Sequence, residues 1–151
     1  MSTQAIAESL DFLLTNFGHE AVSEWIAQYD GWAPFICSLE IPAQGYERHL
    51  VGKTDGLELY FIVWGSNADS GFHGHPEGGC WMRIIQGFLY ETFLDGTVKV
   101  HGPGASGFQQ GAAGIHRIET RGPAVSVHVY APQALLSSQA LLTKKHDTSR
   151  E

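Results

Sequence analysis

The spacing of hydrophobic residues changes once along the chain, after Phe35. Before that point apolar residues recur every three or four positions, which is the period of an amphipathic helix. Gly18 is suited to end a first helix, and Gly31 and Pro34 interrupt the pattern after a second one. We expect both helices to pack on the outside of a sheet and to take no part in the chemistry. The two apolar stripes are Ile6, Leu10, Leu13, Leu14 and Phe17, then Ala21, Val22, Trp25, Ile26 and Tyr29.

After residue 35 the pattern becomes one of short segments rich in Val, Ile, Phe, Tyr and Trp, separated by Gly, Pro, Asp and Asn, which is typical of β-strands. No helical segment lies between them, so we predict an antiparallel sandwich or barrel. The expected architecture is all-β with N-terminal helices, in one domain: a helical cap over 1–33, a barrel over 36–133 and a tail over 134–151. The predicted strands are 46–51, 58–64, 81–86, 88–94, 97–101, 115–120 and 124–130.

Composition narrows the classes of function. A chain of 151 residues with a formal net charge of −7 cannot easily assemble a basic face, which argues against nucleic acid or an anionic membrane as partner. It has no apolar run of membrane-spanning length, and its first residues lack the features of a signal peptide, so we expect a cytoplasmic protein. In that compartment Cys37 and Cys80 should be free thiols, with Cys37 a small buried hydrophobe.

The strongest chemical signal is His73-Gly74-His75. Side chains at i and i+2 project from the same side of a strand, so the two imidazoles can share one metal ion. His116, on a later predicted strand, would complete a site of three nitrogens. With Gly87 after the next strand, this spacing resembles the first motif of the cupins, small antiparallel β-barrels (jelly rolls) that hold a metal in the barrel mouth. Cys80 holds the position where that motif has a glutamate ligand.

Two further points concern the ligands. Glu77 is an alternative fourth ligand, but the loop formed by Pro76 and two following glycines leaves its direction open, so we do not count it. Three neutral imidazoles leave a divalent ion its full charge, whereas a carboxylate ligand would halve that charge. Such an ion favours an anionic partner such as a thiolate, because metal binding strongly lowers the pKa of a thiol.

A second group of polar residues lies on the last predicted strand. With a period of two, Ser126, His128 and Tyr130 share one face of that strand, and the valines at 125, 127 and 129 share the other. We expect the valines to face the helices and the polar residues to face the interior. Ser126 is not a convincing nucleophile, since no acid or elbow motif accompanies it.

With these residues in place, the chain resembles the thiol dioxygenase branch of the cupins, and cysteine dioxygenase in particular. The matching stretches cover most of residues 46 to 132. They are Tyr46-Glu47-Arg48, His73-Gly74-His75 with Cys80, Ile85-Gln86-Gly87 continuing to Tyr90-Glu91-Thr92, the segment 114–119 and the segment 123–132.

The resemblance implies a ferrous ion, Fe(2+), held by His73, His75 and His116. It also implies a thioether between Cys80 and Tyr130, a hydrogen-bond relay through Ser126, His128 and Tyr130, and a cis Ala131-Pro132 bond. Arg48, which shares a face with Tyr46, would bind the substrate carboxylate with a bidentate fork that lysine cannot form.

The reaction so implied adds both atoms of O2 to the sulfur of a small thiol in a monomeric enzyme. L-Cysteine is the first choice of substrate, and 3-mercaptopropionate and mercaptosuccinate are the nearest rivals. Two readings from other classes stay open. One is a non-thiol cupin dioxygenase with three histidines, such as a β-diketone-cleaving enzyme, and the other is a metal-stabilised binding or sensing module without turnover.

Overall fold

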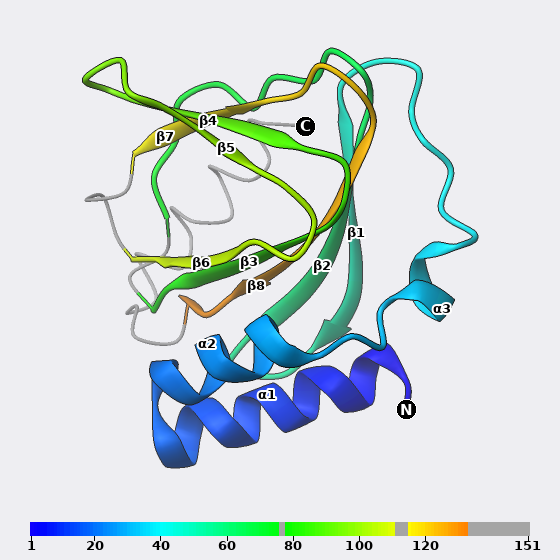
Figure 1. Cartoon of the computed structure of the whole chain (residues 1–151). Coiled ribbons are helices and arrows are strands. Elements are labelled where there is room, and N and C mark those ends of the chain that lie inside the picture. The colour runs from blue at the N-terminus through cyan, green and yellow to red at the C-terminus, as the bar shows by residue number, and fades with distance from the viewer. Residues whose placement is uncertain (76–77, 111–114, 133–151) are drawn as a thin grey trace.

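The computed structural model describes residues 1–75, 78–110 and 115–132. Two antiparallel β-sheets face each other, and two helices, α1 (Thr3–Phe17) and α2 (His19–Gln28), cover the outer face of the larger sheet (Figure 1). The strands are β1 (Tyr46–Lys53), β2 (Glu58–Trp64), β3 (Cys80–Gln86), β4 (Leu89–Phe93), β5 (Val98–His101), β6 (Ser106–Gln109), β7 (His116–Glu119) and β8 (Ala124–Tyr130).

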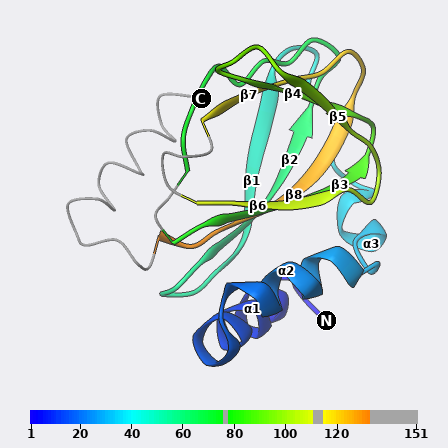
Figure 2. The same ribbon diagram turned by 60° about the vertical axis from the view of Figure 1, so that its left-hand side comes forward.

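The order of the strands brings the last strand, β8, between β2 and β3 in the larger sheet. The larger sheet has the order β1-β2-β8-β3-β6, and the smaller sheet has the order β5-β4-β7. Figure 2 shows the smaller sheet on the side of the larger one that faces away from α1 and α2. The predicted all-β architecture with N-terminal helices is therefore confirmed.

Strand β8 is the central strand of the larger sheet, and all seven of its residues are buried. Val125, Val127 and Val129 belong to the hydrophobic core that the larger sheet forms with the helices. Ser126, His128 and Tyr130 point to the other side, between the two sheets, as the period-two pattern predicted. Strand β8 therefore packs against the helices through its valines and presents its polar side chains to the space between the two sheets.

Helix α1 lies close against β1. Its first turn is capped by Ser2, whose side chain accepts a hydrogen bond from the backbone of Ala5. A glycine is needed at residue 52 of β1, because a Cβ atom there would lie 2.8 Å from the carbonyl oxygen of Thr3. The side chain of Gln4 holds the same strand by bonding both the N–H and the C=O of Lys53. These contacts fix the cap to the edge of the larger sheet.

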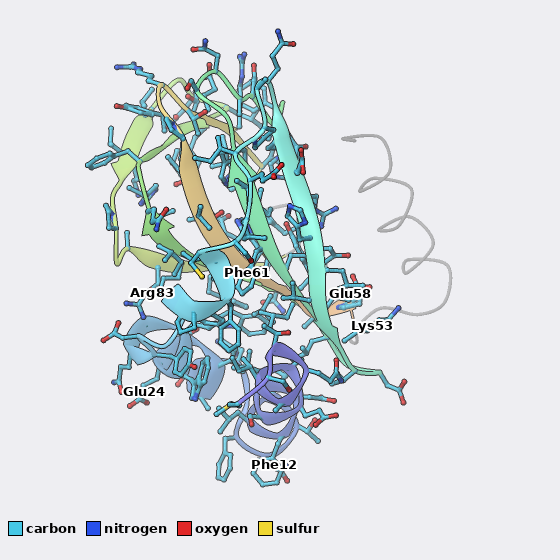
Figure 3. All side chains as sticks on the ribbon, turned by 90° about the vertical axis from the view of Figure 1, so that its right-hand side faces the viewer. Phe12, Glu24, Lys53, Glu58, Phe61 and Arg83 are labelled. Carbon is cyan, nitrogen blue, oxygen red and sulfur yellow. The ribbon has the colours of Figure 1, made fainter. Side chains whose placement is uncertain are left out.

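Helix α2 is held by the strand beneath it, β3. The guanidinium of Arg83 donates hydrogen bonds to the backbone oxygens of Ile26 and Tyr29, at 2.9 and 2.6 Å, where the helix ends. A cation at this position satisfies carbonyls that have no partner within the helix. Figure 3 shows Arg83 beside the helices, with the labelled Phe61 lying between the larger sheet and the helices.

Two elements were not predicted, and one expectation was wrong. The short helix α3 (Ala33–Ile36) extends the helical region past the predicted boundary, and β6 was missed because its sequence Ser-Gly-Phe-Gln has no alternating apolar pattern. Cys37 is exposed rather than buried, because the single turn of α3 directs Ile36 to the core and Cys37 away from it. Cys37 and Cys80 do not form a disulfide with each other. Among the described residues, no helix combines the length and apolar character needed to cross a membrane.

Candidate metal centre

The three predicted histidines come together between the sheets. The segment before β3 runs beside β7, where His73 and His116 exchange two backbone hydrogen bonds of 2.9 and 3.1 Å. Asp69 strengthens this pairing through an ion pair with Arg117 of β7, which lowers the pKa of the Asp69 carboxyl by hydrogen bonding. The Nε2 atom of His116 lies 3.1 Å from the Nε2 atoms of both His73 and His75.

The other ring nitrogens of two of these histidines explain why the Nε2 atoms face one another. Nδ1 of His116 lies 2.5 Å from a carboxylate oxygen of Glu91, and Nδ1 of His73 lies 3.0 Å from the backbone oxygen of Gly71. Both partners are acceptors, so Nδ1 carries the proton and Nε2 keeps its lone pair. Lone pairs that converge in this way repel one another unless an electron-pair acceptor lies between them.

The spacing of the nitrogens fits a metal ion. In an octahedral site with metal–nitrogen bonds of about 2.1 Å, neighbouring ligand nitrogens lie roughly 3.0 Å apart. The two Nε2–Nε2 separations of 3.1 Å are close to that value. His73, His75 and His116 are therefore suited to bind one divalent ion together.

Glu91 is a residue of this centre that the sequence analysis did not single out. It lies on β4 and is only 5% exposed. Besides the hydrogen bond from His116, its carboxylate accepts hydrogen bonds from His101 Nε2 at 2.8 Å and from Gln109 Nε2 at 3.2 Å. Burial alone would raise the pKa of Glu91, but the hydrogen bonds from the two histidines outweigh it and hold that pKa below its ordinary value.

This carboxylate corrects one physical premise of the sequence analysis. No carboxylate holds the ligand position of Cys80, but the Glu91 carboxylate lies one hydrogen bond beyond His116 and would compensate part of the charge of an ion bound there. A signal for Glu91 was present in the sequence. It is a charged residue at the inward-facing, period-two position between Leu89 and Phe93 of an apolar strand.

Arg48 lies in the same cavity as the histidines. The cavity has a volume of about 210 Å³ and is lined by Arg48 and Tyr46 from β1, by the three histidines, and by residues of both sheets. The guanidinium of Arg48 stacks 4.4 Å from the ring centre of Tyr60 and 5.1 Å from that of Tyr130. These aromatic contacts hold the planar guanidinium of Arg48 in a defined direction in the cavity wall.

The polar face of β8 continues the cavity wall. Trp64 Nε1 donates a hydrogen bond of 2.9 Å to Ser126 Oγ, which in turn lies 2.8 Å from His128 Nε2. The rings of His128 and Tyr130 are stacked with centres 6.0 Å apart. Burial is the largest cause that holds the pKa of His128 well below 6.5, and the charge of Arg48 acts in the same direction. His128 is therefore a neutral imidazole.

Cys80 and Tyr130 are direct partners across the β3–β8 pair, and both are buried. Side chains that stand opposite each other in antiparallel strands lie on the same face, with Cβ atoms about 4.5–5.5 Å apart. The fold therefore brings together the two residues for which the resemblance implied a thioether. Gly87, the later glycine of the motif, has a φ of 77°, and a Cβ there would lie 2.3 Å from the backbone oxygen of Pro123.

Three remaining expectations have different outcomes. The Ala131-Pro132 bond is trans, so the expected cis bond was wrong. Ala131 leaves β8 by donating a hydrogen bond to the backbone oxygen of Gly79. Trans is the ordinary preference of a bond that precedes proline. Glu77 and the tail over 134–151 lie outside the described residues. His101 also lines the cavity, where its Nε2 lies 2.8 Å from Oε1 of Glu91.

Comparison with solved structures establishes the class of fold. A cupin superfamily protein from Desulfitobacterium hafniense matches with a TM-score of 0.58 at 15% identity, over 65% of this chain and 87% of that protein. An RmlC-like cupin from Desulfovibrio desulfuricans matches with a TM-score of 0.55 at 14% identity, over 63% of this chain and 90% of that protein. The fold is a cupin, as the histidine motif indicated.

Comparison of sequences identifies the family. The family model for cysteine dioxygenase type I matches residues 20–136. Cysteine dioxygenase type 1 of Danio rerio is 32% identical over 103 residues, and that of Rattus norvegicus is 29% identical over 102; each match covers 58% of this chain and 51% of the relative. The chain thus spans about half the length of the curated relatives it matches. It belongs to the cysteine dioxygenase type I family.

Proposed function

We propose that this protein is an iron(II)-dependent thiol dioxygenase that converts L-cysteine to cysteine sulfinate. The observation that carries the proposal is that Arg48 and the three convergent imidazoles line one cavity. A small thiol acid has a sulfur anion for a metal ion and a carboxylate for an arginine, so it matches both parts of the cavity. Membership of the cysteine dioxygenase type I family supports the same class of reaction.

The chemistry needs no further reductant. A ferrous ion held by His73, His75 and His116 would bind the thiolate and activate dioxygen. Both oxygen atoms end on sulfur, so dioxygen takes up all the electrons that sulfur loses and the thiolate becomes a sulfinate. The chain's own part is to exclude water, to hold the substrate and to place its polar groups beside the reacting sulfur.

Each side chain of the cavity has a role in this proposal. Arg48 binds the carboxylate in a bidentate manner and so orients the sulfur toward the histidines. His128, kept neutral by burial, can accept a hydrogen bond from Ser126 and hold the end of β8 in place. Tyr130 offers its hydroxyl to the reacting groups, and Cys80 joins the tyrosine ring in a thioether that fixes the ring's position.

We further propose that the enzyme acts as a cytoplasmic monomer on a small thiol and O2. Cys37 and Cys80 form no disulfide with each other, which supports a reducing compartment. The net charge of −7 argues against nucleic acid as a partner.

Oxygen consumption by the iron-loaded protein tests the proposal. The panel is L-cysteine, 3-mercaptopropionate and mercaptosuccinate, with cysteamine as the thiol that lacks a carboxylate. We expect Arg48→Ala to lower kcat/KM for the acid-bearing thiols by a factor equivalent to about 2–5 kcal/mol, and to change the slow turnover of cysteamine little. Arg48→Lys should restore only part of the loss, because an ammonium cannot form the two parallel hydrogen bonds.

The same assay separates the alternatives. Oxygen uptake with acetylacetone and with no thiol would identify a non-thiol cupin dioxygenase and refute the proposal. Iron binding without oxygen uptake on any compound of the panel would favour a binding or sensing module. The order of kcat/KM among the thiols decides which of them the cavity selects.

A further inference from the structure

We propose that Glu91 is the positioning residue of the metal centre, which aligns His116 with the ion and supplies the negative charge that three neutral ligands lack. The inference rests on the proposed iron site but does not depend on which thiol is the substrate. The buried carboxylate of Glu91 contacts residues of three other strands.

Three hydrogen bonds hold the carboxylate of Glu91 in place. Oε2 receives His116 Nδ1 of β7 at 2.5 Å and Gln109 Nε2 of β6 at 3.2 Å, and Oε1 receives His101 Nε2 of β5 at 2.8 Å. Both oxygens are therefore engaged, and the donors come from strands of both sheets. A carboxylate held in this way cannot turn, so it determines the rotation of the His116 ring.

The orientation of His116 has a direct consequence for metal binding. With its Nδ1 proton donated to Glu91, the ring can present only Nε2 to the point where His73 and His75 converge. A hydrogen bond to an anion also makes the opposite nitrogen more basic, which strengthens its bond to a cation. His116 is the most buried of the three ligands, so its ring is the one least able to find a different partner in water.

The effect of the negative charge of Glu91 on metal binding can be distinguished from the effect of its hydrogen bonds by substitution. If the residue only tied β4 to its neighbours, the amide oxygen of a glutamine could still accept the hydrogen bond of His116, and the metal would not sense the difference. If the anion balances the ion, the loss of charge should weaken binding, and it should weaken binding of the ferric ion more than that of the ferrous ion. Glu91→Gln tests this because it changes the charge with almost no change in shape.

The experiment is an anaerobic titration of metal-free protein with Fe(II) against a chromophoric chelator, followed by measurement of the Fe(III)/Fe(II) midpoint potential. We expect Glu91→Gln to bind Fe(II) about 10- to 100-fold more weakly than the wild type and to have a higher midpoint potential. Glu119→Gln is the matched control. It removes the same charge from the smaller sheet, but Glu119 lies on the face of β7 opposite to His116, so affinity and potential should not change.

The outcomes are distinct. Equal Fe(II) affinity and equal potential in wild type and Glu91→Gln would overturn the inference. If that variant fails to fold, as judged by the unfolding of its metal-free form, His101→Ala takes its place, because it removes one donor from Glu91 at a partly exposed position. We then expect a smaller loss of Fe(II) affinity in the same direction, and no loss would overturn the inference.

Failure of the proposed function gives a different result. A wild-type protein that binds Fe(II) but oxidises no thiol would refute the dioxygenase proposal, while the affinity series would still decide the role of Glu91. A wild-type protein that binds no Fe(II) would overturn both.

Discussion

The two cysteines differ in their exposure to solvent. Cys37 lies at the end of a single helical turn and is exposed, whereas Cys80 is buried opposite Tyr130 in the β3–β8 pair. The environment of Cys80 leaves its sulfur beside the cavity that holds the histidines. Its chemistry is therefore expected to follow from turnover at that centre rather than from exposure to solvent.

At this scale we predict a covalent change. After aerobic turnover with iron and L-cysteine, the intact mass of the wild-type protein should fall by the two hydrogens lost when Cys80 Sγ bonds to the Tyr130 ring, with dioxygen as the oxidant. Intact-protein mass spectrometry checks this. Cys80→Ser should show no such loss, while Cys37→Ser should behave as the wild type. An unchanged wild-type mass after many turnovers would contradict the prediction.

At the scale of elements, the helical cap and the larger sheet are joined by side chains as well as by an apolar core. Val125, Val127 and Val129 of β8 belong to that core. Arg83 of β3 reaches out from the sheet to the end of α2, where it bonds two backbone oxygens. Its further ion pair with Asp30 adds little, because the Asp30 side chain is 84% exposed and its charge is screened by water.

We predict that Arg83→Met lowers the free energy of unfolding by about 1–3 kcal/mol, because the carbonyl oxygens at the end of α2 lose charged donors in a partly buried place. Urea unfolding of the metal-free protein, followed by tryptophan fluorescence, measures the change. Asp30→Asn is the matched control and should shift the midpoint little. A loss of similar size in both variants would show that the surface ion pair, and not the helix end, carries the stability.

At the scale of the whole molecule, the metal centre joins parts of the fold that are distant in sequence. His73 and His75 lie in the segment between β2 and β3, and His116 lies on β7 of the smaller sheet. Glu91 adds β4, and its partners add β5 and β6. An ion bound there connects segments that separate when the chain unfolds, so it binds the native state alone.

We therefore predict that Fe(II) raises the free energy of unfolding, by about 2.7 kcal/mol when the free ion is at 100 times its dissociation constant. Anaerobic urea unfolding with and without the ion gives the difference. His75→Ala removes one ligand without touching the pair formed by Glu91 and His116, and most of the gain should disappear in it. If the variant gains as much stability as the wild type, the ion is not bound at this site.

The sequence by itself determined the elements and part of the site. The period of the apolar residues located α1, α2 and most strands within a residue or two, since burial on one face of a helix or strand imposes that period directly. The same alternation placed Ser126 with His128, whereas His73 and His75 lie in the segment before β3 and not on the strand that was expected there. It did not find β6, whose residues pair with β3 through backbone groups that any sequence possesses.

Only the tertiary structure decided how the pieces meet. Whether His116 turns toward the other two histidines depends on a carboxylate 25 positions away, and no local pattern specifies a contact between two strands. The position of Arg48 beside Tyr60 and Tyr130 likewise depends on the register in which β1, β2 and β8 pair. Neighbouring residues in the sequence determine the hydrophobic period of each helix and strand. The distance between the Glu91 carboxylate and the metal-binding histidines depends on how the strands pack in the folded protein.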